Sequence, residues 1–102
     1  MEFKTNNFTF EWDETKNFTN ISKHGISFET AVKIFEDENR VEIYDIKHSI
    51  SEDRFIVIGI VEKVLTVVYT ERKEKIRIIS ARCASKKERR IYKLYGDSKK
   101  DY

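Results

Sequence analysis

The sequence predicts an α+β domain in which helices pack against one antiparallel sheet, in the order β-α-α-β-β-β-β-α. Apolar residues recur at helical spacing near the N-terminus, four β-rich segments with short connections follow, and a capping box precedes a last helix. A chain of 102 residues has room for one core. We therefore expect a single domain over 1–102, with a structured core over about 8–95 and a tail over 96–102.

The first strand and two helices are expected in the N-terminal third. Residues 8–12 alternate apolar and polar side chains, as a half-buried strand does. Asp13 is a good N-cap for a helix over about 14–24, which Gly25 would end in the left-handed conformation. Ser27 can cap a second helix, whose apolar side chains share one face and should pack on the core. These side chains are Phe28, Ala31, Val32 and Phe35.

Four strands are expected in the following part of the chain. Their residues alternate or are rich in β-branched and aromatic side chains. They span 40–46, 54–61, 64–70 and 75–82. The short connections favour antiparallel neighbours, because a parallel return needs a crossover of about a dozen residues. A capping box of Ser85 and Glu88 then predicts a helix of about 11 residues with an apolar side and a basic side.

Composition excludes several classes of protein. With 39% hydrophobic residues, no proline, three glycines and one cysteine, the chain is not disordered, collagen-like or a disulfide scaffold. Its longest nearly apolar run, 55–61, is too short to cross a bilayer, and residues 1–10 do not resemble a signal peptide. The unpaired Cys83 is expected to be a buried structural thiol in a reducing cytoplasm.

Charge is unevenly distributed along a chain whose formal net charge is only +2. Residues 71–95 contain ten basic and three acidic side chains, whereas residues 36–53 contain two basic and seven acidic ones. One interpretation is a basic surface that binds phosphates, with the acidic segment turned away from it. The alternative is a solvated surface whose opposite charges compensate one another in the folded chain.

Several catalytic motifs are missing from the sequence. There is no Gly-rich phosphate loop, no nucleophilic Ser elbow and no His-Glu-x-x-His zinc motif. One cysteine and two distant histidines do not have the spacing of a structural zinc site. The carboxylates at 36–38 are consecutive and would point in different directions at a helix end. We therefore expect neither a metal nor a cofactor.

RNA cleavage suits the remaining residues, because RNA carries its own nucleophile, the 2′-hydroxyl. A base removes the hydroxyl proton, an arginine stabilises the charge that develops at phosphorus, and an acid protonates the departing 5′-oxygen. Histidine titrates near neutral pH, which makes His24 a candidate for proton transfer, whereas His48 lies in the acidic segment. The candidate cations are Arg54, Arg72, Arg77, Arg82 and Lys86.

These residues also have structural explanations. His24 could cap the carbonyls at a helix end, and Arg77 could pair with an acid on a neighbouring strand. Trp12 is expected in the core, although Trp12, Tyr69 and Tyr92 are also candidate platforms for stacking an unpaired base. From the residues alone, a ribonuclease, a non-catalytic nucleic-acid-binding or co-repressor module, and a protein-docking domain all stay open.

Two blocks of the sequence resemble the BrnT family of toxins. The first is Phe10-x-Trp12-Asp13-Glu14-x-Lys16-Asn17 followed by Asn20-x-x-Lys23-His24-Gly25-Ile26-x-Phe28-Glu29-x-Ala31. The second comprises Val67-Val68-Tyr69-Thr70-Glu71-Arg72 and Arg77-Ile78-Ile79-Ser80-Ala81-Arg82-x-Ala84, with Arg54 and Gly59 before it and Lys86, Glu88, Arg89 and Tyr92 after it. The similarity covers about residues 8–95. Position 83, usually basic in such sequences, is a cysteine here.

The resemblance implies a RelE-like fold and a toxin of a type II toxin–antitoxin module that cleaves RNA without a metal and arrests translation. It implies catalytic roles for His24, Arg72 and Arg82. Phosphate contacts are expected from five further cations, namely Lys16, Lys23, Arg54, Arg77 and Lys86. The implied partner is a BrnA-like antitoxin whose ribbon-helix-helix part binds operator DNA. The toxin would then reach DNA only through its antitoxin, and we expect no membrane contact.

Overall fold

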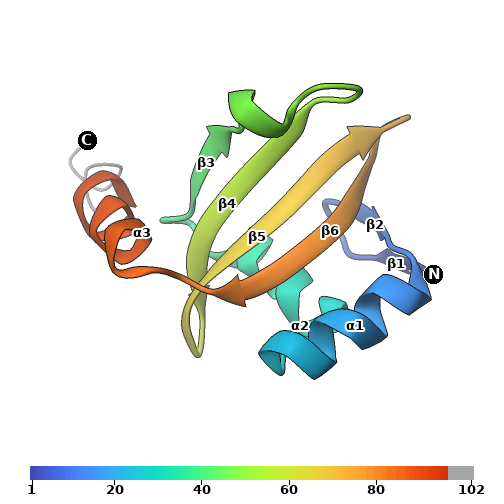
Figure 1. Ribbon diagram of the computed structural model, residues 1–102, viewed down its shortest axis with the longest axis horizontal. Coiled ribbons are helices and arrows are strands. Elements are labelled where there is room, and N and C mark those ends of the chain that lie inside the picture. Colours follow the sequence, from blue (N-terminus) through green and yellow to red (C-terminus); the bar gives the residue numbers. More distant parts are fainter. Residues whose placement is uncertain (97–102) are drawn as a thin grey trace.

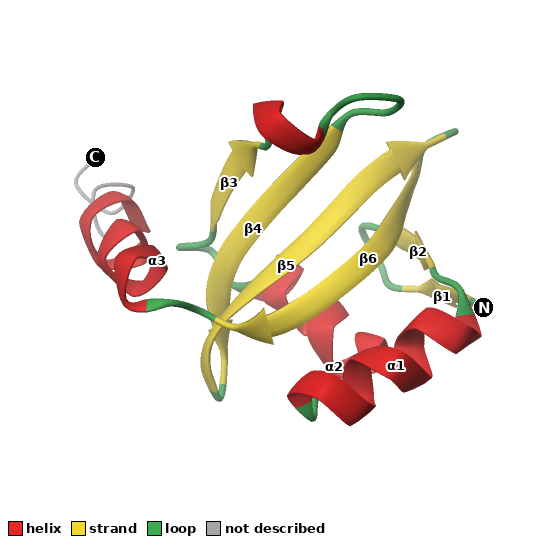
Figure 2. Cartoon of the chain, in the orientation of Figure 1, coloured by secondary structure: helices red, strands yellow, loops and turns green. Residues whose placement is uncertain are grey.

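The computed structural model describes residues 1–96 and has the α+β architecture that the sequence predicts (Figures 1 and 2). Six strands form one sheet in the order β1-β2-β6-β5-β4-β3. In Figure 1 helix α2 lies behind the sheet, α1 runs beside β6, and α3 lies at the far side from the N-terminus. The predicted tail over 96–102 falls, apart from the buried Gly96, outside the described residues.

The four strands predicted in the second half of the chain are present and antiparallel to their neighbours. They are β3 (Val41–Tyr44), β4 (Arg54–Val61), β5 (Lys63–Arg72) and β6 (Lys75–Cys83). A β-bulge interrupts the β5–β6 pairing, because Tyr69 lies opposite Ile78 whereas Val68 lies opposite Ser80. Ile79 is therefore an extra residue on β6 without a partner on β5. Because of it, β6 residues an odd number of positions apart across the bulge point to the same face of the sheet.

The N-terminal edge of the sheet differs from the prediction in two ways. An additional strand, β1 (Glu2–Lys4), pairs with β2 (Thr9–Glu11), and its three residues are too few to show an alternating pattern. Strand β2 in turn pairs with β6 in parallel, so the sheet is not purely antiparallel. The rule of short connections does not apply to this pair, because β2 and β6 lie far apart in the chain.

The predicted start and end of α1 (Glu14–His24) are confirmed. Asp13 accepts hydrogen bonds from the backbone amides of Thr15 and Lys16, and Gly25 follows the last turn with a φ of 69°. A left-handed residue at this position ends a helix without the steric cost that a side chain would add. The chain can therefore turn sharply after His24, which stands at the exposed end of α1.

The second predicted helix is divided between two geometries. Ser27 caps α2 (Phe28–Ala31) through a hydrogen bond from the amide of Thr30. The chain then continues as the 3₁₀ helix η1 (Val32–Glu36). The 3₁₀ helix winds more tightly than an α-helix, so the side chain of Ile34 is buried as well as those of the expected face, Val32 and Phe35.

The core lies between the sheet and the α2–η1 segment. Its aromatic residues pack in a connected series, with ring centroids 5.2 Å apart both for Phe10 and Phe35 and for Phe35 and Tyr69. Trp12 is buried against Phe28, as expected for a packing residue. Fully buried side chains of this core include Phe10, Phe28, Ile34, Val57, Leu65, Val67 and Ile78.

The last helix begins where the capping box predicts. In α3 (Lys86–Ile91) Ser85 accepts from the amide of Glu88 and Glu88 accepts from the amide of Ser85; a π-helical turn, η3 (Tyr92–Gly96), follows. The Tyr92 hydroxyl donates to Asp37 over 2.7 Å and so ties this segment to the loop after η1. Within residues 1–96 no helix is long and apolar enough to span a membrane.

Candidate functional site

One face of the sheet packs on α2 and the core (Figure 1). The opposite face, called the open face below, carries charged, polar and aliphatic side chains. Cross-strand partners share a face. Arg54 on β4 and Arg77 on β6 both lie opposite Thr70 on β5, and Arg82 lies opposite Thr66, four pairs further along. The register therefore brings three arginines that are distant in sequence to the open face.

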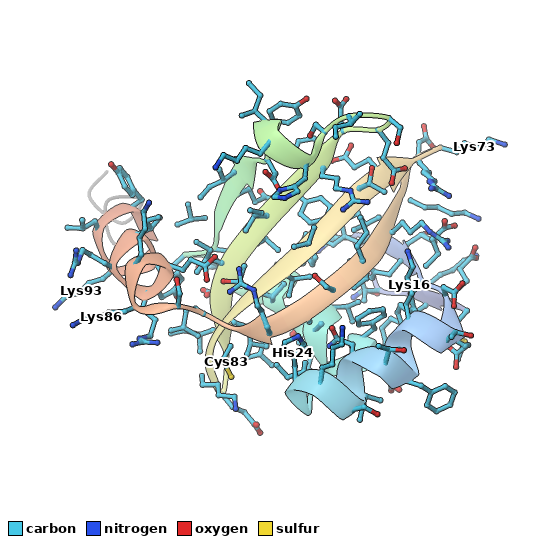
Figure 3. All side chains as sticks on the ribbon, viewed as in Figure 1. Lys16, His24, Lys73, Cys83, Lys86 and Lys93 are labelled. Atoms are coloured by element: carbon cyan, nitrogen blue, oxygen red, sulfur yellow. The ribbon has the colours of Figure 1, made fainter. Side chains whose placement is uncertain are left out.

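The first of two hollows on this face lies between α1 and β6. It has a volume of about 230 Å³ and is lined by Lys16, Lys23 and His24 on α1 and by Ile79 and Ser80 on β6. Figure 3 shows His24 near the end of α1, beside β6. Three of the predicted site residues thus line one hollow.

Helix α1 is held against β6 by a buried side chain that mimics a neighbouring strand. The Asn20 Oδ1 accepts from the Ala81 amide over 3.0 Å, and Asn20 Nδ2 donates to the Ala81 carbonyl over 2.8 Å. The same Nδ2 also donates to the carbonyl of Ile26. Strand β2 pairs with β6 only at Ile76 and Arg77, so the Ala81 backbone has no strand partner on that edge. Asn20 supplies the missing hydrogen bonds and thereby fixes the helix that carries His24.

The second hollow lies over the middle of the open face, also with a volume of about 230 Å³. Arg54 and Arg82 line it together with Asp45 and His48 from the segment after β3. Its remaining lining residues are Ile56, Val68, Ile79 and Ser80. Since Ile79 and Ser80 also line the first hollow, the two adjoin; together they are called the groove below.

Arg54 offers an unused donor in the groove. Its Nε is buried and has no hydrogen-bond partner, and no ion pair is seen for this arginine among residues 1–96. A buried donor without a partner is costly, whereas an anion placed in the groove would satisfy it. Arg54 is therefore the groove arginine without an acidic partner among residues 1–96, whereas Arg82 is paired with Glu88.

Arg82 is held in place by Glu88. Its Nη1 and Nη2 donate to the two carboxylate oxygens over 2.6 and 2.9 Å. Burial acts to raise the pKa of Glu88, but hydrogen bonds from Arg82 and from the Ser85 amide outweigh it and lower the pKa to about 2. The hydrogen bond with Glu88 raises the pKa of Arg82 in turn. The pair fixes the orientation of a guanidinium at one end of the groove.

A second imidazole, which the sequence did not assign to the site, lies in the groove. His48 Nδ1 lies 2.8 Å from Asp45 Oδ2, and the His48 side chain is 66% exposed while that of Asp45 is only 14% exposed. One interpretation of the charge pattern turned the acidic segment away from the basic surface, but Asp45 of that segment lines the groove. The spacing of an acid and a histidine three residues apart was the signal available in the sequence.

Arg72 does not line the groove. It pairs with Glu52 over 3.0 Å at the far end of β5 and lines another hollow with Glu11, Lys73 and Lys75. The structure therefore does not bring Arg72 into one hollow with His24 and Arg82. Its predicted catalytic role stays a prediction.

Two predicted phosphate contacts also lie outside the groove. Arg77 is on the open face but pairs with Glu11 over 3.0 Å, as the structural alternative proposed. Lys86 begins α3, and Figure 3 shows it at the far side of the molecule from Lys16. Their contacts with RNA stay predictions.

The expectation for Cys83 is wrong, and the candidate stacking residues lie away from the groove. Cys83, expected to be buried, is exposed at the last position of β6 (Figure 3), although its cross-strand partner Leu65 belongs to the core. None of the candidate stacking residues lines the groove: Trp12 is buried in the core, Tyr69 donates from there to Glu42, and the Tyr92 hydroxyl binds Asp37. The described groove has an aliphatic floor instead, formed by Ile56, Val68 and Ile79.

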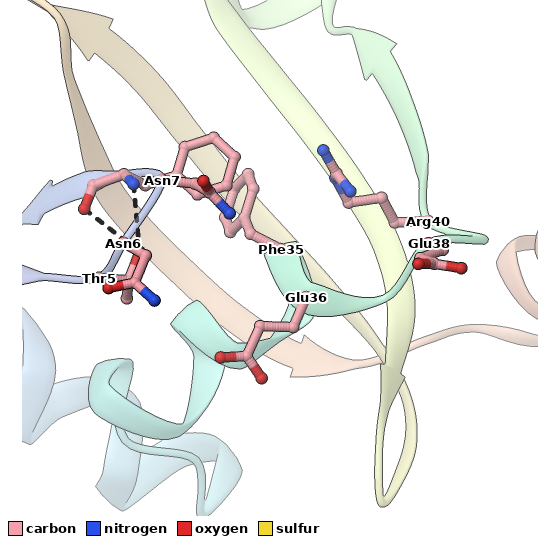
Figure 4. A pocket seen from close by; sticks show the side chains of 8 residues that line it. Thr5, Asn6, Asn7, Phe35, Glu36, Glu38 and Arg40 are labelled. Atoms are coloured by element: carbon pink, nitrogen blue, oxygen red, sulfur yellow. Dashed lines mark hydrogen bonds between the residues drawn. The ribbon is translucent and has the colours of Figure 1, made fainter.

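A separate hollow of about 570 Å³ lies between the turn after β1 and the end of η1 (Figure 4). Glu36, Glu38 and Arg40 line it beside Phe35, and Arg40 stacks over the Phe35 ring at 5.9 Å. No histidine lines this hollow and two carboxylates do. It is therefore less suited to a phosphodiester than the groove.

Comparison with known proteins assigns the chain to a family. A family model described as the ribonuclease toxin BrnT of type II toxin–antitoxin systems matches residues 12–88. The crystal structure of the Brucella abortus ribonuclease toxin BrnT is similar to this chain, with a TM-score of 0.58 and 26% identity, over 76% of this chain and 96% of that one. A search of curated protein sequences found no match. Because the family model spans most of the sequence, the chain belongs to the BrnT family of ribonuclease toxins of type II toxin–antitoxin systems.

Proposed function

We propose that the chain is an endoribonuclease that cleaves RNA in the groove without a metal, by attack of the ribose 2′-hydroxyl on the adjacent phosphodiester. The observation that carries this proposal is that one imidazole, His24, and two guanidinium groups, Arg54 and Arg82, line two adjoining hollows of the open face. Proton transfer and stabilisation of phosphate charge are the two needs of this reaction.

The residues divide into those two roles. His24 transfers a proton, and Arg54 and Arg82 hold the non-bridging oxygens as negative charge grows on them. Lys16 and Lys23 line the first hollow, where they contact neighbouring phosphates. The aliphatic floor offers no aromatic platform, so RNA is held mainly through its backbone, and base preference is weak.

The partner follows from family membership, since a type II toxin is paired with a protein antitoxin. We propose a BrnA-like antitoxin with a ribbon-helix-helix part that binds operator DNA, so that the toxin contacts DNA only through it. Uncontrolled cleavage of RNA in the cytoplasm would arrest translation, and the antitoxin would prevent this. Coexpression with the adjacent gene product should restore growth and preserve RNA.

Cleavage of single-stranded RNA by the purified chain tests the proposal. We expect cutting in the presence of EDTA, with a 2′,3′-cyclic phosphate on the 5′ product. The double variant His24→Ala, Arg82→Ala should lose this activity and keep the wild-type circular dichroism spectrum. Lys33→Ala, on η1 and outside the groove, is the control and should cut like the wild type.

A different outcome would assign another function. Cutting that stops in EDTA would contradict the metal-independent mechanism. Wild-type cutting by the double variant would contradict the residue assignment. RNA binding without any turnover would favour the alternative of a non-catalytic nucleic-acid-binding or co-repressor module.

A further inference from the structure

We infer that His48, oriented by Asp45, is the general base that removes the proton from the attacking 2′-hydroxyl, and that His24 supplies the proton to the leaving group. The inference rests on the proposed function and extends it by assigning the two proton-transfer roles. Its basis is that His48 and Asp45 form a hydrogen-bonded pair in the same hollow as Arg54 and Arg82, whereas His24 lines the adjoining hollow.

The hydrogen bond with Asp45 determines which nitrogen of the His48 ring can act. Asp45 is an acceptor when ionised, so the neutral ring donates from Nδ1 and leaves Nε2 with a free lone pair. The Asp45 side chain is largely buried, whereas the His48 ring is exposed and accessible from the groove. When Nε2 gains a proton, the carboxylate stabilises the resulting imidazolium.

The pair is not needed to hold its own loop. His48 ends the short 3₁₀ helix η2 (Ile46–His48), and the Asp45 side chain makes no capping bond to it. The loop is held instead by Ser49, whose hydroxyl donates to the Asp45 carbonyl over 2.6 Å and accepts from the Arg54 amide over 2.9 Å. The backbone amide of Asp45 also donates to the Arg54 carbonyl. The loop therefore has three hydrogen bonds that do not involve the His48 ring or the Asp45 carboxylate.

The charged groups that face His48 suit a base near a phosphate. Asp45 lies on its own segment, Arg54 faces it from β4, and Arg82 faces it from β6. The two arginines bind the phosphodiester, and Asp45 offsets their positive charge at the imidazole. His24 reaches the same linkage from across the Ile79–Ser80 floor that both hollows share.

The proposed reaction moves two protons and exchanges one bond at phosphorus for another. The 2′-hydroxyl loses its proton to His48 Nε2 as its oxygen forms a bond to phosphorus. The bond between phosphorus and the 5′-oxygen breaks, and that oxygen takes a proton from the His24 imidazolium. The products are a 2′,3′-cyclic phosphate and a free 5′-hydroxyl, with no change of oxidation state and no co-reactant.

The experiment compares wild type, His48→Ala, Asp45→Asn and the control Lys47→Ala on a DNA oligonucleotide that contains one ribonucleotide. His48→Ala should lower kcat by about 100-fold or more, and added imidazole should restore part of the rate. Asp45→Asn should lower kcat by about tenfold with little change in KM, because it alters the orientation and charge of the base and not the phosphate contacts. Lys47 does not line the groove, so the Lys47→Ala variant should cut like the wild type.

A second substrate separates the two histidines. Sulfur in place of the 5′-bridging oxygen gives a leaving group that needs no proton. On this substrate His24→Ala should recover most of the wild-type rate, whereas His48→Ala should stay slow. The opposite pattern would exchange the base and the acid and so overturn the assignment.

The outcomes distinguish this inference from the proposed function. If the wild type cuts and His48→Ala cuts within twofold of it, the inference is wrong and the proposed function stands. A slow His48→Ala enzyme that imidazole does not accelerate, with an unchanged urea midpoint, would also overturn the role as base. If the wild type itself does not cut, both proposals fall.

Discussion

Arg82 and Glu88 form a two-point ion pair that joins the groove to α3, with Nη1–Oε1 and Nη2–Oε2 distances of 2.6 and 2.9 Å. Glu88 also completes the capping box with Ser85. The Glu88 carboxylate thus caps the N-terminus of α3 and orients the Arg82 guanidinium that the proposed reaction uses. The stability of the α3 segment and the geometry of the groove are coupled through this contact.

Acid should weaken the fold through Glu88. Because its folded pKa of about 2 lies below the ordinary value of 4.5, the ionised carboxylate stabilises the fold above about pH 4.5. This contribution is lost as the pH falls from there toward about 2. Since the Arg82 side chain is 40% exposed, we discount the contribution to about 1–2 kcal/mol.

The variant Glu88→Gln measures that contribution. Glutamine keeps an acceptor oxygen for the capping box and lacks the charge. Urea unfolding between pH 7 and 2 should show a shallower loss of stability in Glu88→Gln than in the wild type. Glu29→Gln, an exposed change on α2, is the control, and equal slopes for all three proteins would contradict the prediction.

Asn20→Ala should destabilise the chain by about 2–4 kcal/mol. The buried amide and carbonyl of Ala81 both lose their partner, and Ile26 loses a donor. Cleavage should also fall, because α1 is then free to shift with His24. Urea unfolding measures the first effect, with the exposed Ser22→Ala as control; a change below about 0.5 kcal/mol would exclude the proposed role of Asn20 at the sheet edge.

Asp37→Ala should cost about 2–4 kcal/mol. Burial acts to raise the pKa of Asp37, but bonds from the Ile60 amide and the Tyr92 hydroxyl outweigh it and keep the pKa below its ordinary value. The ionised carboxylate accepts both bonds at one oxygen, over 2.8 and 2.7 Å. Thermal unfolding at pH 7 tests this, with Glu36→Ala as the exposed control; equal midpoints would refute it.

RNA binding should weaken as salt increases, and Arg54 should contribute more to this dependence than Arg72. For single strands the slope of log K against log salt is about −0.7 per neutralised phosphate. Arg54→Ala should reduce the slope by about that amount. Arg72→Ala should change it less, because Glu52 already pairs with that arginine.

Titration of a fluorescent RNA at several salt concentrations measures these slopes. Arg90→Ala, an exposed change on α3, is the control. A larger change for Arg72→Ala than for Arg54→Ala would move the RNA out of the groove and toward the end of the β5–β6 hairpin.

Local signals in the sequence determined the helix boundaries. Asp13, Gly25, Ser27 and Ser85 each act on amides or carbonyls within a few residues, so their effect does not depend on the rest of the fold. The short connections likewise determined the antiparallel pairing of β3 to β6. The family resemblance came from the same local blocks, and it is confirmed.

The composition of the groove was decided by tertiary structure. Arg77 and Arg82 are five residues apart, and strict alternation would put them on opposite faces; the bulge at Ile79 puts both on the open face. Arg54 and His48 enter the groove, and Arg72 does not, because the register of β4 on β5 and the fold of the η2 loop set their positions. These strand registers and loop positions bring together segments that are far apart in the chain. Their energy depends on side-chain packing between those segments, which local sequence patterns do not predict.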